Sequence, residues 1–166
     1  MNAKLMGTIA LAASFCVGGC GSDDAGNDGM PGYGGTSGTS GTSATGAAVN
    51  VTLGEYEVTV APASATAGEI TFSIENTGDD AHEFVVVMTD LAAADLPTHS
   101  DGSFDEQGDG VEVVDEVDLI APGDSEELSV DLDPGSYLLV CNFVVPEDDG
   151  LESHFHEGMV APFTVE

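Results

Sequence analysis

The chain has 166 residues, which is enough for one domain and a tail, and its formal net charge at pH 7 is -30. The acidic residues number 31, and the single basic residue is Lys4. Because phosphate neutralisation needs cations, this composition excludes nucleic-acid binding, and the same charge would be repelled by anionic lipid headgroups.

Residues 1–19 have the features of a lipoprotein signal peptide. Lys4 lies in a short positive start, and residues 5–17 are nearly all apolar or small, too short a stretch to span a bilayer as a stable anchor. The stretch Val17-Gly18-Gly19-Cys20 resembles the bacterial lipobox, which predicts a lipidated Cys20 as the new N-terminus. An ordinary secretory signal cleaved nearby is the alternative, and Cys16 fits a lipobox less well because bulky Phe15 precedes it.

Residues 20–48 are predicted to form a flexible tether that follows the lipidated cysteine. They are rich in Gly, Ser and Thr, and the triplet Gly-Thr-Ser occurs three times in succession from Gly35 to Ser43. Such a composition has almost nothing to bury and is typical of a flexible coil. The folded domain is therefore expected over residues 49–166.

The sequence of this domain alternates between apolar and polar residues, which is typical of half-buried strands. Turn residues separate the runs, for example Asn76-Thr77-Gly78 and Pro134-Gly135. Tyr56 is expected on the same face of a strand as Val58 and Val60. The pattern predicts an all-β sandwich, with strands over residues 56–60, 70–74, 82–88, 127–132, 137–140 and 159–165. Residues 91–110 are expected to be an acidic connection with at most one helical turn near residues 92–95.

Four side chains of the predicted domain could bind a metal: His82, Cys141, His154 and Met159. Cys141 would be the only thiol of the mature chain, and an unprotected thiol outside the cytoplasm is prone to oxidation. A soft thiolate, two imidazoles and a weak thioether are the ligands of blue-copper electron-transfer sites. Each residue taken singly has a structural explanation, since Met fills core gaps and a strand-end His can be hydrogen-bonded. Their joint order favours the copper site.

Several motifs resemble the cupredoxins, and in particular the plastocyanin, halocyanin and sulfocyanin type of small blue copper protein in its lipoprotein form. The resemblance covers residues 49–166, and its motifs are Asn76-Thr77-Gly78 before His82-Glu83-Phe84, Pro134-Gly135-Ser136-Tyr137, Cys141-Asn142, and His154-Phe155-His156-Glu157-Gly158-Met159. It implies a Greek-key β-sandwich with one type 1 copper near one pole. By this match His82 and His154 are the imidazole ligands, Cys141 is the thiolate and Met159 is the axial group.

The chain departs from the family in one place. Plastocyanin-like proteins have only a few residues between the Cys and the second His, whereas residues 142–153 intervene here. A longer loop must be ordered by its own packing, which leaves His156 as a rival to His154 for the second imidazole. His99 lies among Ser, Asp and Gly and is expected to be a solvated loop residue.

The resemblance implies a protein that carries single electrons between extracytoplasmic redox partners and is anchored to a membrane by its lipid. An imidazole edge near the surface is the expected route of the electron. The acidic surface is interpreted first as an adaptation to high salt, because the acids are spread along the whole chain, and second as steering toward a partner with a basic docking surface. A copper-delivery lipoprotein without a redox role is the alternative function, and a copper-free sandwich for adhesion or display is a third. No enzymatic activity is expected, because no nucleophile elbow supports a Ser-His-Asp arrangement.

Overall fold

The computed structural model describes residues 46–147 and 150–166. The predicted signal peptide, the predicted lipidation site Cys20 and all but the end of the predicted tether lie outside the described residues. Ala47 and Ala48, which the sequence analysis assigns to the tether, form the beginning of the first strand. Within the described ranges no helix is both long enough and apolar enough to span a bilayer.

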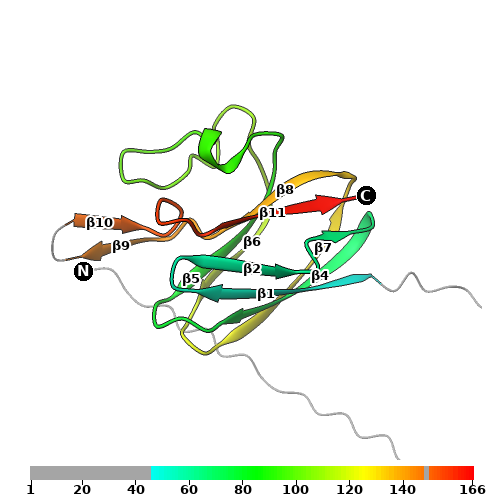
Figure 1. The fold of residues 1–166 in the computed structure, drawn as a ribbon, viewed down its shortest axis with the longest axis horizontal. Helices are drawn as coiled ribbons and strands as arrows, with labels where there is room; N and C mark the ends of the chain where they lie inside the picture. The colour runs from blue at the N-terminus through cyan, green and yellow to red at the C-terminus, as the bar shows by residue number, and fades with distance from the viewer. Residues whose placement is uncertain (1–45, 148–149) are drawn as a thin grey trace, which may run out of the picture. The chain divides into compact units, whose positions relative to one another are not determined.

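Two sheets and one separate hairpin make up the domain (Figure 1). The first sheet has the order β2-β1-β4-β7, built from β1 (Ala47–Gly54), β2 (Glu57–Ala61), β4 (Gly68–Asn76) and β7 (Ser125–Leu132). The second has the order β3-β11-β8-β5-β6, built from β3 (Ser64–Ala65), β5 (His82–Met88), β6 (Glu112–Ile120), β8 (Gly135–Val140) and β11 (Val160–Val165). The hairpin consists of β9 (Val144–Glu147) and β10 (Gly150–Ser153).

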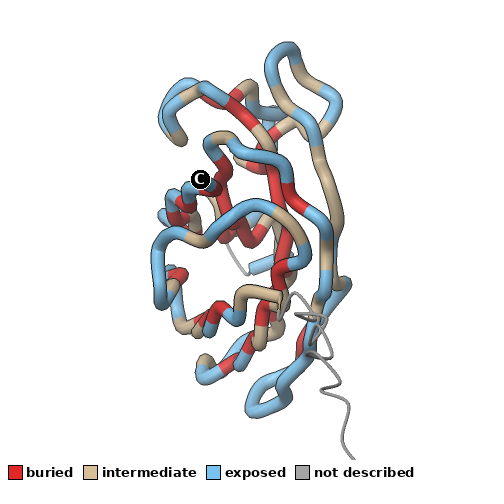
Figure 2. Tube along the Cα trace, turned by 90° about the vertical axis from the view of Figure 1, so that its right-hand side faces the viewer, coloured by how far each residue is buried: buried red, intermediate tan, exposed pale blue. Residues whose placement is uncertain are grey.

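The core lies between the two sheets and follows the alternation of the sequence. In β4, for instance, Ile70, Phe72 and Ile74 are buried while the residues between them are not. Their aromatic member, Phe72, packs against Phe84 of β5 and Phe163 of β11 across the sandwich. Figure 2 shows buried residues alternating with half-buried and exposed ones along the chain. The predicted all-β Greek-key sandwich is confirmed.

Strand β5 is buried on both faces, because a second apolar cluster covers its outer side. Val85 and Val87 pack there with Leu96 and Phe104, which belong to the long connection between β5 and β6. That connection was predicted only as an acidic loop, and the structure shows that it also supplies apolar side chains to a small core of its own. Its single turn of 3-10 helix, η1 (Ala93–Asp95), lies where the sequence analysis expects at most a helical turn.

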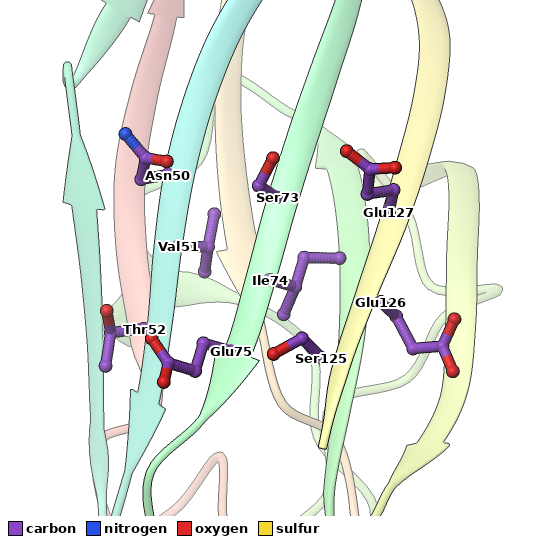
Figure 3. Close-up of a pocket in the computed structure, with 9 residues that line it drawn as sticks. All are labelled: Asn50, Val51, Thr52, Ser73, Ile74, Glu75, Ser125, Glu126 and Glu127. Carbon is purple, nitrogen blue, oxygen red and sulfur yellow. The ribbon is translucent and has the colours of Figure 1, made fainter. Parts of the chain in front are cut away.

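A shallow hollow on the first sheet lies along β1, β4 and β7 (Figure 3). Polar and acidic side chains such as Asn50, Ser73, Glu75 and Glu127 line it, and none of the predicted metal ligands does. The predicted ligands His82 and Cys141 lie elsewhere, at the end of the sandwich where β5 begins and β8 ends.

Candidate metal centre

His82 is the first residue of β5, and a buried amide fixes the loop that leads to it. The side-chain nitrogen of Asn76 donates to the carbonyl oxygens of Asp80 and Ile120, both at 2.8 Å. Its side-chain oxygen accepts the Gly78 N–H at 2.9 Å. The fully buried Asn76 side chain therefore holds this loop in place, because losing any of these hydrogen bonds inside the protein would be costly.

The same loop leaves no space beside the His82 ring. A Cβ atom added to Gly78 would lie 2.8 Å from His82 Nε2 and 2.6 Å from a carboxylate oxygen of Glu55. Glu55 Oε1 accepts the N–H groups of Asp79 and Asp80 at 2.6 and 3.0 Å and lies 4.0 Å from His82 Nε2. Glycine at position 78 therefore permits the close approach of loop, carboxylate and imidazole.

Cys141 directly follows β8, and a backbone N–H of β5 favours the thiolate form of its sulfur. Its own N–H donates to the carbonyl of Met159 at 3.0 Å, and its Sγ accepts the N–H of Glu83 at 3.2 Å. Burial nevertheless raises the pKa of the Cys141 thiol to about 11, against the opposing effect of the N–H groups of Phe143 and Glu83. A bound cation would therefore be needed to keep this sulfur deprotonated at neutral pH.

His154 is presented by the insertion that distinguishes this chain. Within this insertion β9 pairs with β10, and the His154 N–H closes the base of the pair by donating to Phe143 O at 2.9 Å. In the turn that follows His154, the Met159 N–H donates to the His154 carbonyl at 3.0 Å. The long loop is thus ordered by its own strand pairing and holds His154 in the interior, fully buried.

The three donor atoms converge at one point. The Nδ1 atoms of His82 and His154 are 3.1 Å apart, and Cys141 Sγ lies 3.9 Å from the first and 3.4 Å from the second. A point equidistant from all three atoms is about 2 Å from each, close to the bond lengths of imidazole and thiolate to a first-row metal. Burial lowers the pKa of both imidazoles, which keeps them in the neutral form that a metal requires.

Met159 lies at the same end of the sandwich, while the other two histidines do not take part. Met159 is fully buried, belongs to the same apolar cluster as Cys141, and bonds through its backbone to both Cys141 and His154. His156 is exposed and pairs with Glu157 at 3.7 Å, so the structure brings His154, and not its rival, to the other donors. His99 is exposed near Asp105, as expected.

The donor set fits a type 1 copper ion on its chemistry. Two neutral imidazoles and one thiol form a buried trigonal group, and a thioether residue lies beside it. This is the combination of ligands found in blue-copper sites. The Nε2 atoms of both histidines are buried and have no hydrogen-bond partner, so the Nδ1 atoms are the ones that face the group.

The imidazoles, of which one edge was expected near the surface, lie beneath other side chains. Neither imidazole reaches the surface, since His82 and His154 are both 0% exposed. Two aromatic rings cover His154 edge-on, Tyr56 at a centroid distance of 6.0 Å and Phe143 at 5.6 Å. Tyr56 was expected within a strand, but it occupies the β1–β2 turn and is 37% exposed.

A half-buried carboxylate beside the site was not anticipated from the sequence. Burial, and then the charges of Glu106 and Glu116, raise the pKa of Glu83 to about 7. The oxygen atoms of these three carboxylates lie within 4.8 Å of one another. In a chain with so many acids, no sequence signal separates these three from the rest, because Glu83 and Glu116 are brought together by the pairing of β5 with β6, while Glu106 belongs to the connection between these strands and is bonded to Asn142.

No protein-family model matches the chain, and no curated protein does either. Among solved structures the chain is similar to reduced auracyanin from the photosynthetic bacterium Roseiflexus castenholzii, with 20% identity, 73% of this chain and 99% of that chain covered, and a TM-score of 0.49. Rusticyanin from Thiobacillus ferrooxidans is 15% identical over 74% of this chain and 79% of its own, with a TM-score of 0.48. Auracyanin A, a "blue" copper protein from Chloroflexus aurantiacus, is 16% identical over 72% and 99%, with a TM-score of 0.44.

The architecture follows from the strands of this chain, and its chemistry follows from the geometry of the donor atoms. The cupredoxin-like arrangement that the sequence predicts is a Greek-key sandwich with His, Cys, His and Met at one pole. That arrangement is present in the described residues.

Proposed function

We propose that this chain is a mononuclear type 1 copper protein that carries single electrons between redox partners outside the cytoplasm. The observation that supports it most strongly is the buried convergence of two imidazole Nδ1 atoms on one thiol sulfur. In this proposal His82, Cys141 and His154 are the equatorial ligands and Met159 is the weak axial ligand. Bound copper would supply the one-electron couple between Cu(I) and Cu(II).

The protein's own part is to hold these ligands still while the charge of the site changes. His82 and Cys141 stand at the ends of two paired central strands, since β5 and β8 are neighbours with Val85 opposite Val140. The Glu83 N–H to the Cys141 sulfur favours the thiolate and moderates its electron donation. Full burial of the donors excludes water, so little needs to rearrange when an electron arrives or leaves.

A copper-delivery role is less well supported by the same geometry. A delivery site must release its metal to an acceptor, whereas all three donors here are 0% exposed and lie beneath the hairpin and the β1–β2 turn. Delivery would nevertheless be indicated by a colourless Cu(I) complex that passes its metal on and never becomes blue.

The test is the visible and EPR spectrum of the copper-loaded protein, with one substitution at each ligand. We expect the intense thiolate-to-copper absorption of a blue site, bleached reversibly on reduction and lost in Cys141→Ser. His154→Ala should abolish or change the spectrum, whereas His156→Ala is the matched control and should not. Met159→Leu should keep the colour and raise the reduction potential. Colour retained in Cys141→Ser would overturn the proposal.

We also propose that Cys20 is lipidated and that the chain from Cys20 up to the first strand tethers the domain to a membrane, so that the domain can reach redox partners in the periplasm or at the cell surface. The support is the lipobox-like sequence and the Gly, Ser and Thr content of the tether. Cys20→Ser should move the protein from the membrane to the soluble fraction, while Cys16→Ser should leave it bound. Equal membrane retention of both variants would contradict lipidation at Cys20.

A further inference from the structure

Because the proposed copper ligands are buried, a redox partner has to approach them through another side chain. Electron transfer falls off steeply with distance, so a partner must reach a side chain that touches a ligand. Of the two rings that cover His154, Phe143 is half-buried and lies at the base of the hairpin, whereas Tyr56 is exposed. Tyr56 is therefore the more exposed of the two rings that contact His154.

The position of Tyr56 is fixed from both sides. It adopts φ +59°, a left-handed conformation that is uncommon for a bulky residue and costs energy. Its hydroxyl donates to Glu152 of β10 at 2.6 Å, which joins the β1–β2 turn to the inserted hairpin. Figure 1 shows the two segments at the same end of the sandwich. A strained residue held by a long-range bond over a ligand is a common feature of functional sites.

The surroundings of Tyr56 are acidic and come from separate segments of the chain. Its hydrogen bond with Glu152, and then burial and the charges of Glu152, Asp80 and Glu157, raise the pKa of Tyr56 to about 12. Asp80 belongs to the β4–β5 loop and Glu157 to the turn after β10, and both are exposed. Since residues 46–166 contain no Lys or Arg, no such side chain within the domain offsets these charges.

We propose that the redox partner docks on the Tyr56 face, defined as Tyr56 with Asp80, Glu152 and Glu157, and that this partner is a one-electron redox protein with a cationic surface. The inference rests on the proposed function. One exposed aromatic ring within an acidic rim matches the usual anatomy of an interface, with an aromatic anchor and charges that steer and orient the partner. Copper held by the proposed ligands would supply the electron that reduces the oxidised centre of the partner, or would accept one from the reduced partner, with no bond made or broken.

The docking surface is tested first without copper, by titrating the ¹⁵N-labelled metal-free protein with mitochondrial cytochrome c, a basic one-electron haem protein, as the probe. Amide shifts should centre on Tyr56 and Glu152. Tyr56→Ala should weaken binding about tenfold, as expected for an aromatic anchor, and Tyr56→Phe should weaken it less because the ring remains. Shifts centred on another face would overturn the proposal.

Charge specificity is tested with a pair of matched double variants, each lacking two carboxylates. Glu152→Gln with Glu157→Gln removes charge from the Tyr56 face, and Glu69→Gln with Asp131→Asn removes it from the opposite pole, where these exposed residues face each other across β4 and β7. The first pair should weaken binding several-fold more than the second. Equal weakening would mean that the probe responds only to overall charge and would overturn the proposal.

The copper-loaded protein then separates this inference from the proposed function. In stopped-flow reactions with cytochrome c, Tyr56→Ala should lower the second-order rate constant about tenfold while the visible spectrum stays that of the parent. Added salt should lower the rate constant of the parent protein, because it screens the attraction. Unchanged rates in a blue Tyr56→Ala protein would overturn the docking surface alone. A parent protein that never forms a blue site would overturn the proposed function, while the titration still decides the docking surface.

Discussion

At the scale of single residues, the site depends on the lack of a side chain at Gly78 as well as on the proposed ligands. A Cβ atom added to Gly78 would lie closer to His82 Nε2 and to the Glu55 carboxylate than real Cβ atoms approach other atoms. Glu55 is in turn bonded to two loop N–H groups, so it cannot move away without losing them. The His82 ring is the part that would have to turn.

We predict that Gly78→Ala destabilises the metal-free protein by about 1–3 kcal/mol, the usual cost of overpacking, and shifts the visible spectrum of the loaded protein. Thermal unfolding and the copper spectrum measure the two effects. Gly54→Ala is the matched control, because a Cβ there would meet its nearest atom, Thr77 Oγ1, at an ordinary 3.8 Å. Equal effects of the two substitutions would show that the crowding at Gly78 is not what holds His82.

The raised pKa of Glu83 predicts that the stability of the folded protein depends on pH. Burial raises its pKa from 4.5 to about 7, so the folded protein holds this proton more tightly than the unfolded chain does. The resulting stabilisation is complete below pH 4.5 and is lost as the pH rises through about 7. Glu83→Gln should therefore stabilise the metal-free protein at about pH 8 relative to the parent, by about 1 kcal/mol once solvent screening is allowed for, and much less at about pH 4.

Chemical denaturation at the two pH values measures this difference. The parent protein, measured at the same two pH values, is the reference for each comparison. If Glu83→Gln gave the same stabilisation at both pH values, the carboxyl group would not be titrating in this window.

At the scale of elements, one side chain joins the site to the second apolar cluster. Asn142, which follows Cys141, accepts the Phe104 N–H at 2.8 Å and donates to the Phe104 carbonyl at 3.1 Å and to Glu106 at 2.9 Å. Phe104 is fully buried and packs on Phe155, which follows His154. The connection between β5 and β6 is thus fastened to the residues on either side of the hairpin.

We predict that Asn142→Ala loosens this connection and lowers the free energy of unfolding by about 2–3 kcal/mol, because it leaves buried backbone groups of Phe104 without partners. Limited proteolysis should cut the β5–β6 connection sooner, and thermal unfolding should occur at a lower temperature. Asn50→Ala, at an exposed position of β1, is the control. Proteolysis at the parent rate would mean that the apolar packing of the connection suffices without Asn142.

The elements also differ in how far the sequence predicts them. Strands that bury one face, such as β4 and β7, are recognised by their alternation. β6 was not predicted, because its Val residues are interspersed with acids in a chain where acids occur everywhere, and the β9–β10 hairpin was treated as a loop. The proposed ligands could be picked out because His and Cys are scarce in the domain. The role proposed for Tyr56 could not be predicted, since it depends on a turn that bonds to Glu152, almost a hundred positions away.

At the scale of the whole molecule, the domain folds against its own charge. Residues 46–166 contain no Lys or Arg, and some acids stand directly opposite each other, as Glu69 and Asp131 do across β4 and β7. The ion pairs within the described residues involve only histidines, which are partners only when protonated. Electrostatic repulsion is therefore a general cost to the folded state, and it is not confined to one site.

Salt should relieve that cost. Between about 0.1 M and about 1 M NaCl the Debye length falls from about 10 Å to about 3 Å, which screens carboxylates on neighbouring strands from one another. We predict that the unfolding temperature of the metal-free protein rises by about 5 °C or more over this range. KCl should act equally, because screening depends on ionic strength, and Glu69→Gln should lessen the rise by removing one cross-strand repulsion. An unfolding temperature that does not change with salt would mean that the acids lie too far apart on the folded surface to repel one another, and the acidity would then have to be explained by the cationic partner alone.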